Sequence, residues 1–147
     1  MLKLSIDKII GRIVVFTLLI VLLASANASG QKDPVDAELM QTLNNYFDGR
    51  RNADLGLLRK AYDPEAGLET VNAEGEIQHI SFKAYLEVVK SAGPVKVKTE
   101  VVDISITHTV AVAQTRFDYG PVIYHDYLTL LKTKDGWKII NKAFFKL

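Results

Sequence analysis

The 147-residue chain lacks cysteine entirely. This absence excludes disulfide bonds, thiolate metal sites, a cysteine nucleophile and a lipid attached to a cysteine. Histidine is scarce as well: the three histidines, at positions 79, 108 and 125, lie in separate segments, without the one-turn spacing typical of paired metal ligands. We therefore expect no metal site and a fold that depends on its core alone.

An excess of charge of either sign is also missing. With 18 basic and 17 acidic residues the formal net charge is +1, and the basic residues gather on no obvious face, which argues against a nucleic-acid partner. The chain contains no nucleophile elbow, no glycine-rich phosphate loop and no dinucleotide-binding fingerprint. We therefore expect no cofactor.

No apolar run is long enough to span a bilayer comfortably. Near the amino terminus three basic residues precede the apolar residues 13–23, and a spanning helix needs roughly 20. Small residues follow at the spacing that a signal peptidase prefers, which favours cleavage after Ala28 and, as a second choice, after Ala26. We interpret residues 1–28 as a signal peptide and expect a periplasmic or secreted protein without membrane contact after cleavage. An uncleaved anchor is the alternative.

The remaining residues, 29–147, fit one ordinary domain of about 120 residues. Removal of the signal takes away three basic residues and one acidic residue, so the formal net charge falls from +1 to about −1. No internal repeat or low-complexity tract divides this segment. We expect a single domain.

Three segments of that domain have helical patterns. The first begins with Asp33 as N-cap and Pro34 at the first helical position, and it ends at Gly49. The second, capped by Asn52, stops before the Asp-Pro pair at 63–64, and the third, capped by Ser81, stops at the Gly-Pro pair at 93–94. Between them "GLETV" and "GEIQHI" are short strand candidates.

Beyond residue 94 the pattern alternates as in strands. In "VKVKTEVVDISIT" the polar positions change parity near Val101 and Val102, which predicts a bulge or a sharp bend. A similar shift in "TVAVAQTRFDYG" predicts that the next strand is kinked too. Helices followed by a long antiparallel sheet indicate an α+β fold.

The order of these elements resembles the nuclear transport factor 2-like superfamily. Within it, "YFDGRRNADLGLLRKAYDPEAGL" and "YHDYLTLLKTKDGWKIINKAFF" resemble the "putative lumazine-binding" branch, a SnoaL-like group. The resemblance implies a curved antiparallel sheet wrapped around three N-terminal helices, a cone-shaped cystatin-like roll with an internal pocket. It does not imply one chemistry, because this scaffold carries isomerases, dehydratases, hydrolases and non-catalytic binders.

The carboxy-terminal hairpin looks apolar on both faces. A three-residue loop at positions 134–136 would place Leu131 opposite Ile139 and Thr129 opposite Asn141. One face then turns towards the helices and the pocket. The other is an apolar patch with a lysine rim, and such a patch usually marks an interface. We expect a homodimer through this second face, formed by Leu128, Leu130, Ile140 and Phe144.

The ligand-binding pocket is expected on the first face and beside the helices. Arg116 and Asp118 are included because either could pair with His125 across neighbouring strands. The candidate residues are Tyr46, Tyr62, Arg116, Asp118, His125, Tyr127, Trp137 and Asn141. The alternative for such a tyrosine is a core position with its hydroxyl satisfied at the edge. Replacing Tyr46 by phenylalanine is therefore expected to leave folding nearly intact and to weaken ligand binding.

Catalysis has less support from the residues. The resemblance to ketosteroid isomerase, a distant relative, places Tyr46 at the position of the hydroxyl donor. The position of the aspartate base holds Thr70, which is no base at neutral pH, and Glu69 points to the opposite face of the strand. His125 and Asp126 are adjacent in a strand and cannot share a pocket.

Three function classes follow. We favour a non-catalytic binder of a small molecule, because aromatic residues gather where the pocket is expected while no acid and base converge there. A lyase or isomerase of the SnoaL or ketosteroid isomerase kind, acting on a small cyclic substrate, is the first alternative. A structural dimer with a vestigial cavity is the second.

Overall fold

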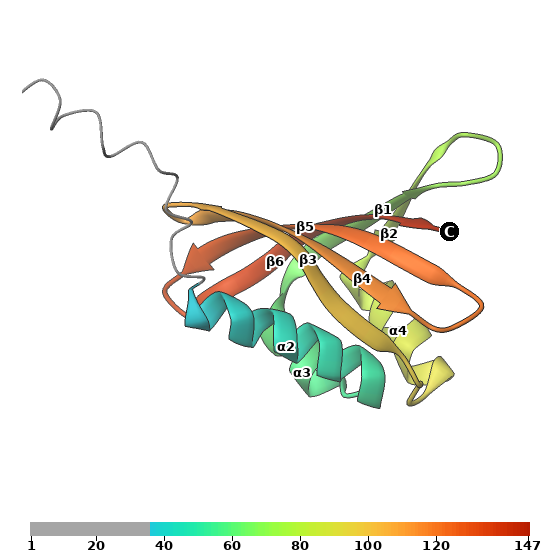
Figure 1. Ribbon diagram of the computed structural model, residues 1–147, viewed down its shortest axis with the longest axis horizontal. Coiled ribbons are helices and arrows are strands. Elements are labelled where there is room, and N and C mark those ends of the chain that lie inside the picture. The colour runs from blue at the N-terminus through green and yellow to red at the C-terminus, as the bar shows by residue number, and fades with distance from the viewer. Residues whose placement is uncertain (1–35) are drawn as a thin grey trace, which may run out of the picture. The chain divides into compact units, whose positions relative to one another are not determined.

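The computed structural model describes residues 36–147 (Figure 1). The expected signal peptide, and Asp33 and Pro34 as the start of the first helix, lie outside the described residues. Three helices and six strands follow in the order α2 (Ala37–Asn52), α3 (Leu55–Ala61), β1 (Tyr62–Val71), β2 (Ile77–Ser81), α4 (Phe82–Ala92), β3 (Lys98–Thr107), β4 (Val110–Asp118), β5 (Ile123–Thr133) and β6 (Gly136–Lys146). This arrangement confirms the α+β class.

Helix α2 begins at a different cap from the expected one. The N-cap is Asp36, whose Oδ1 accepts hydrogen bonds from the backbone N–H groups of Glu38 at 2.9 Å and Leu39 at 3.3 Å. The prediction that the helix ends at Gly49 is wrong, because α2 continues to Asn52. Gly49 is buried, and a Cβ at this position would lie 2.8 Å from Cγ of Leu58. The glycine is therefore needed for close packing of α2 against α3.

The predicted caps of the two shorter helices have different outcomes. Helix α3 is capped by Asp54 rather than by Asn52, since the Asp54 carboxylate accepts from the N–H groups of Gly56 and Leu57 at 2.8 and 3.0 Å. For α4 the prediction is confirmed: Ser81 is the N-cap and Gly93, with φ of 67°, ends the helix.

The six strands form one sheet in the order β2-β1-β6-β5-β4-β3. All neighbouring strands are antiparallel except β1 and β6, which run parallel. Figure 1 shows the three helices on one face of this curved sheet. The helix-covered face therefore holds the core and any cavity.

The two expected strand distortions have different outcomes. In β3 the register passes from Val101 opposite Thr115 to Asp103 opposite Gln114, which leaves Val102 as the extra residue and confirms the bulge. In β4 the prediction of a kink is wrong. Pairing with β5 is continuous, and the residues of one parity are all buried: Ala111, Ala113, Thr115 and Phe117.

The register of the β5–β6 hairpin differs from the predicted one in its loop and in one bulge. Thr133 pairs with Gly136, so the loop contains two residues rather than three. Thr129 faces Asn141 as predicted, but Leu130 rather than Leu131 pairs with Ile139. Ile140 is therefore an extra residue in β6. Before it the odd-numbered Trp137 and Ile139 face inward, and after it the even-numbered Lys142 does.

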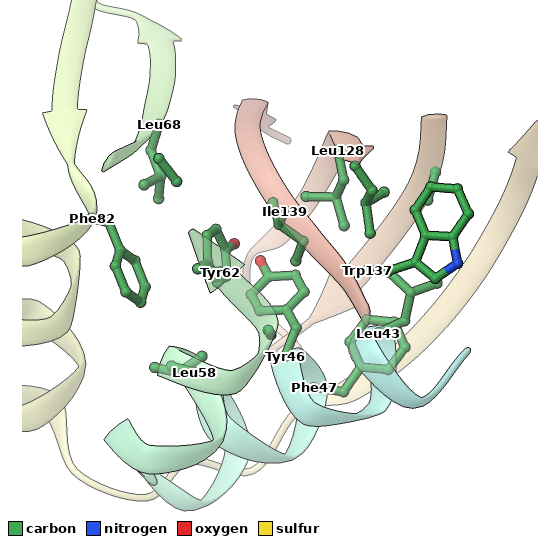
Figure 2. Packing of buried hydrophobic residues seen from close by; sticks show 14 of the residues in the cluster. Leu43, Tyr46, Phe47, Leu58, Tyr62, Leu68, Phe82, Leu128, Trp137 and Ile139 are labelled. Atoms are coloured by element: carbon green, nitrogen blue, oxygen red, sulfur yellow. The ribbon is translucent and has the colours of Figure 1, made fainter. Parts of the chain in front are cut away.

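This register reverses the expected faces of β5. Leu128 and Leu130 are 0% exposed, whereas Tyr127 is 44% exposed. The prediction that Leu128 and Leu130 belong to an exposed interface is thus wrong, because both lie in the core. Figure 2 shows Leu128 and Ile139 in the core together with Trp137 and the helix residues Leu43 and Leu58.

Candidate functional site: an aromatic cavity with buried charges

A cavity of about 420 Å³ lies between the helices and the inner face of the sheet. Residues of α2, α4 and five strands line it, together with the segment that joins β4 to β5. The lining consists of Tyr46, Arg50, Leu68, Ile80, Tyr85, Val88, Phe117, Tyr119, Pro121, Val122, Tyr124, Asp126, Lys142 and Phe144. It is apolar and aromatic with few charges, as is typical of small-molecule sites.

Aromatic rings make up much of the wall. The ring of Tyr46 on α2 lies 4.9 Å from that of Phe117 on β4, measured between centroids. Tyr124 at the start of β5 contacts Tyr119 edge-on at 5.9 Å and Phe144 of β6 at 6.2 Å. These rings come from elements far apart in the sequence, and their faces and edges are the surfaces on which a flat ring system packs.

Three polar side chains interact at the buried end of this wall. The hydroxyl of Tyr46 donates a hydrogen bond of 2.5 Å to Oδ2 of Asp126. Nζ of Lys142 donates to the Tyr46 hydroxyl at 3.2 Å and lies 3.6 Å from Oδ1 of Asp126. Asp126 is 1% exposed and Lys142 is 7% exposed, so the trio is a buried ion pair bridged by a phenol.

Burial shifts the pKa values of Tyr46 and Lys142. It raises the pKa of Tyr46 well above the ordinary range, and the negative charge of Asp126 acts in the same direction. Tyr46 is therefore a neutral hydrogen-bond donor. Burial lowers the pKa of Lys142, while attraction to Asp126 opposes that shift. The Lys142 ammonium also lies 5.6, 5.1 and 4.7 Å from the ring centroids of Tyr46, Tyr85 and Phe144.

Arg50 is the third charged residue of the cavity. It projects from the last turn of α2, and its guanidinium lies 5.5 Å from the centroid of the Tyr119 ring. Its Nη1 atom is buried and has no hydrogen-bond partner among residues 36–147. Within the same residues Arg50 forms no ion pair, in contrast to its neighbour Arg51, which pairs with Asp48 and donates to Thr99 at 2.9 Å.

The cavity lining includes only one of the eight expected pocket residues, Tyr46. Tyr62 lies behind it in the core, with ring centroids 5.4 Å apart (Figure 2). Trp137 is buried at 2% exposure but does not line the cavity. The placement of Trp137 in the pocket is therefore wrong, although its burial explains the strong apolar pattern of β6.

The remaining five expected residues lie elsewhere, and for His125 and Tyr127 the reason is that the two faces of β5 are the reverse of those expected. Arg116 and Asp118 form an ion pair at 3.0 Å, and Asp118 lines a separate groove beside Lys98. His125 stacks on Phe145 at 5.2 Å, and Tyr127 is exposed. The Asn141 amide donates to Glu69 at 2.6 Å. None of these five residues lines the aromatic cavity.

Sequence reasoning missed all three charged residues of the lining. Asp126 could have been found, because it has the same parity in β5 as Leu128 and Leu130, and two leucines at alternate positions indicate the buried face. Lys142 could not, because only the bulge at Ile140 turns it inward. Phe144 shares that inner face and lines the cavity instead of the expected interface, and Ile140 is half-buried.

Metal and membrane features can be assessed over the described residues. Between positions 36 and 147, acidic and histidine side chains form no cluster of three suited to a metal ion. In the same region no helix combines the length and apolarity needed to cross a membrane.

Comparison with known proteins places the chain in a fold superfamily. A family model described as "putative lumazine-binding" matches residues 34–145. No curated protein matches the chain. A similar solved structure is that of a nuclear transport factor 2-like protein of unknown function from Shewanella baltica. It has a TM-score of 0.70 and 21% identity over 75% of this chain and 91% of that chain.

Two further solved structures are similar. One is a nuclear transport factor 2-like protein of unknown function from Methylobacillus flagellatus, with a TM-score of 0.68 and 24% identity over 77% of this chain and 94% of that chain. The other is a cystatin-like fold protein from Burkholderia xenovorans, with a TM-score of 0.53 and 19% identity over 73% of this chain and 89% of that chain. At these identities the likeness establishes the fold alone.

Proposed function

The chain belongs to the family described as "putative lumazine-binding", within the nuclear transport factor 2-like superfamily, and from this premise we propose that it binds a small planar aromatic ligand in the cavity. The observation that carries the proposal is the composition of the wall: six aromatic residues line one cavity of about 420 Å³. Flat ring systems gain from stacked and edge-on contacts with such side chains.

The polar groups of the cavity fit a heterocycle better than a plain hydrocarbon. Asp126 and Lys142 lie together at the buried end, and Arg50 is placed near Tyr119. A few fixed polar groups in an otherwise apolar pocket orient a ligand through its ring heteroatoms or substituents. The family description names lumazine, a fused-ring heterocycle of this kind, and so makes it the first ligand to test.

A lyase or isomerase is the second candidate function, and one observation favours it. A carboxylate, a phenol and an ammonium group meet in the cavity wall, as general acid–base catalysis requires. However, Oδ1 of Asp126 is buried and Oδ2 already accepts the Tyr46 hydrogen bond, so neither oxygen is open to a substrate. Binding without catalysis therefore remains the first choice.

Two further proposals concern the setting of the domain. We propose that it pairs with a second copy through the outer face of the sheet. The exposed apolar residues on this face, which replace the interface residues expected from the sequence, are Val110, Val112, Tyr127 and Phe145, each 43–44% exposed. Export to the periplasm or to the medium rests on residues 1–28 and remains a prediction.

A matched pair of tyrosines in β5 tests the binding proposal. Tyr124 lines the cavity, whereas Tyr127 on the same strand points to the other face. We expect calorimetric titration with lumazine and related fused-ring heterocycles to give saturable binding. Tyr124→Ala should weaken it by about tenfold, and Tyr127→Ala should leave it unchanged. Absence of binding across the panel, or equal losses in both variants, would contradict the proposal.

A further inference from the structure

We propose that the ligand of this cavity carries a single negative charge and that its anionic group pairs with Arg50. The inference rests on the proposed function, since it concerns a ligand in the same cavity. It adds the charge of that ligand and the residue that recognises it.

The first argument is the balance of charge in the lining. Among the fourteen lining residues only Arg50, Lys142 and Asp126 carry a formal charge. Asp126 lies 3.6 Å from Lys142 and compensates that ammonium group. Arg50 has no carboxylate partner in residues 36–147, and the cavity is left with one uncompensated positive charge. A ligand with one negative charge restores neutrality.

The second argument is the condition of the guanidinium group. Nη1 of Arg50 is buried without a hydrogen-bond partner, and a buried charged donor that lacks a partner is costly. A carboxylate or an equivalent planar anion matches the fork of a guanidinium with two parallel hydrogen bonds. Arg50 lines the cavity beside Tyr119. A ligand whose anionic group pairs with Arg50 can therefore pack its aromatic ring against the ring of Tyr119.

The third argument excludes the opposite charge. Rings within about 6 Å of an ammonium group form the kind of cage that binds cationic ligands. Here Lys142 already occupies that place, with its Nζ 4.7–5.6 Å from the centroids of Tyr46, Tyr85 and Phe144. A cationic ligand would instead add a second uncompensated positive charge beside Arg50.

A pair of probes of nearly equal shape tests the inference. The carboxylate of 2-naphthoate is replaced by a neutral amide in 2-naphthamide, so the two differ chiefly in charge. Calorimetric titration should show that the wild-type protein binds 2-naphthoate at least about tenfold more tightly than 2-naphthamide. Arg50→Gln should abolish this preference, and Arg50→Lys should retain part of it because the charge is kept without the fork.

Arg51→Gln is the matched control, since Arg51 is adjacent on α2 but does not line the cavity. It should leave the preference unchanged, and thermal unfolding of each variant should verify that it is folded. Equal binding of both probes by the wild type, or a preference that survives in Arg50→Gln, would overturn the inference while the binding function stands. If neither probe binds, this inference fails, and the titration with lumazine and related heterocycles decides separately whether the binding function stands.

Discussion

The phenol of Tyr46 and the carboxylate of Asp126 are joined by a hydrogen bond of 2.5 Å across 80 positions of the sequence. This bond connects α2 with β5 at the wall of the cavity, where both residues are only 1% exposed. An ionised carboxylate in such surroundings needs its partners, because water cannot replace them. The pair thus stabilises the packing of α2 on the sheet as well as shaping the cavity.

Two buried tyrosines that differ in their hydrogen bonds give the first prediction. Tyr46→Phe deprives Asp126 of its donor and should lower the free energy of unfolding by about 2 kcal/mol. This replaces the expectation, drawn from the sequence, of nearly intact folding. Tyr62→Phe should be neutral or slightly stabilising, because the Tyr62 hydroxyl is buried without a partner within residues 36–147. Urea unfolding followed by the fluorescence of Trp137, the single tryptophan, measures both. Equal losses of unfolding free energy in Tyr46→Phe and Tyr62→Phe would contradict the role assigned to the hydrogen bond between Tyr46 and Asp126.

The second prediction concerns alkaline pH. Burial raises the pKa values of Tyr46, Tyr62 and Tyr85, so the folded state keeps three phenols protonated that ionise after unfolding. These phenols contribute fully to stability below pH 10, which is about the pKa of a tyrosine in the unfolded chain, and the contribution is lost as the pH rises above that pKa. Lys142 acts the other way: its lowered pKa lets stability rise with pH up to its unfolded value near 10.5.

The tyrosine effect is therefore best isolated at the highest pH. Between about pH 10.5 and 11.5 the free energy of unfolding should fall by up to about 1.4 kcal/mol per pH unit for each of the three tyrosines. Tyr62→Phe should reduce this slope by up to about 1.4 kcal/mol per pH unit, since it removes one of the buried phenols. Urea unfolding at closely spaced pH values checks both statements, and a slope unaffected by Tyr62→Phe would refute the proposed origin.

The third prediction concerns the contact between α2 and α3. A Cβ added at Gly49 would lie 2.8 Å from Cγ of Leu58 and 3.0 Å from its backbone nitrogen. Gly49→Ala should therefore destabilise the protein by about 2 kcal/mol, although alanine is the better helix former. Leu58→Ala in the same chain should relieve part of the overlap, so the double variant should lose less than the two single losses combined. Strict additivity would show that Leu58 is not what makes alanine unfavourable at position 49.

These cases show which features of the molecule its sequence predicts. Caps and terminators act locally, so Ser81 and the Gly-Pro pair at 93–94 could be recognised from their neighbours. The bulge in β3 was predicted because polar positions change parity within one strand. In β6 a single inserted residue, Ile140, has the same effect, but the first inward-facing residue after it is the charged Lys142, so no apolar alternation marks the change.

The candidate site depended on that one residue. The register of the hairpin decides which face of the sheet each side chain of β5 occupies. Because the bulge was not detected, the prediction assigned Asp126 to the outer face and His125 to the cavity, whereas the structure has Asp126 in the cavity wall. Tyr46 lines the cavity, and it was expected there because its position follows from the apolar stripe of a helix, which needs no partner strand. Arg50 lies one turn further along the same helix and was missed because nothing local distinguishes a cavity-lining arginine from a solvated one.

The last prediction concerns the outer face of the sheet, where the expected interface now involves other residues. Tyr127 and Phe145 are exposed on the neighbouring strands β5 and β6, and Val112 is exposed on β4. If a second copy covers this face, light scattering at micromolar concentration should give twice the mass of one chain. Tyr127→Lys should then shift the protein to the monomer without unfolding it, because it places a charge in the interface. Leu130→Lys should instead unfold the domain, since Leu130 is 0% exposed and a lysine there would be buried without a partner. A wild-type monomer would refute the dimer, and a folded Leu130→Lys variant would refute the face assigned to β5.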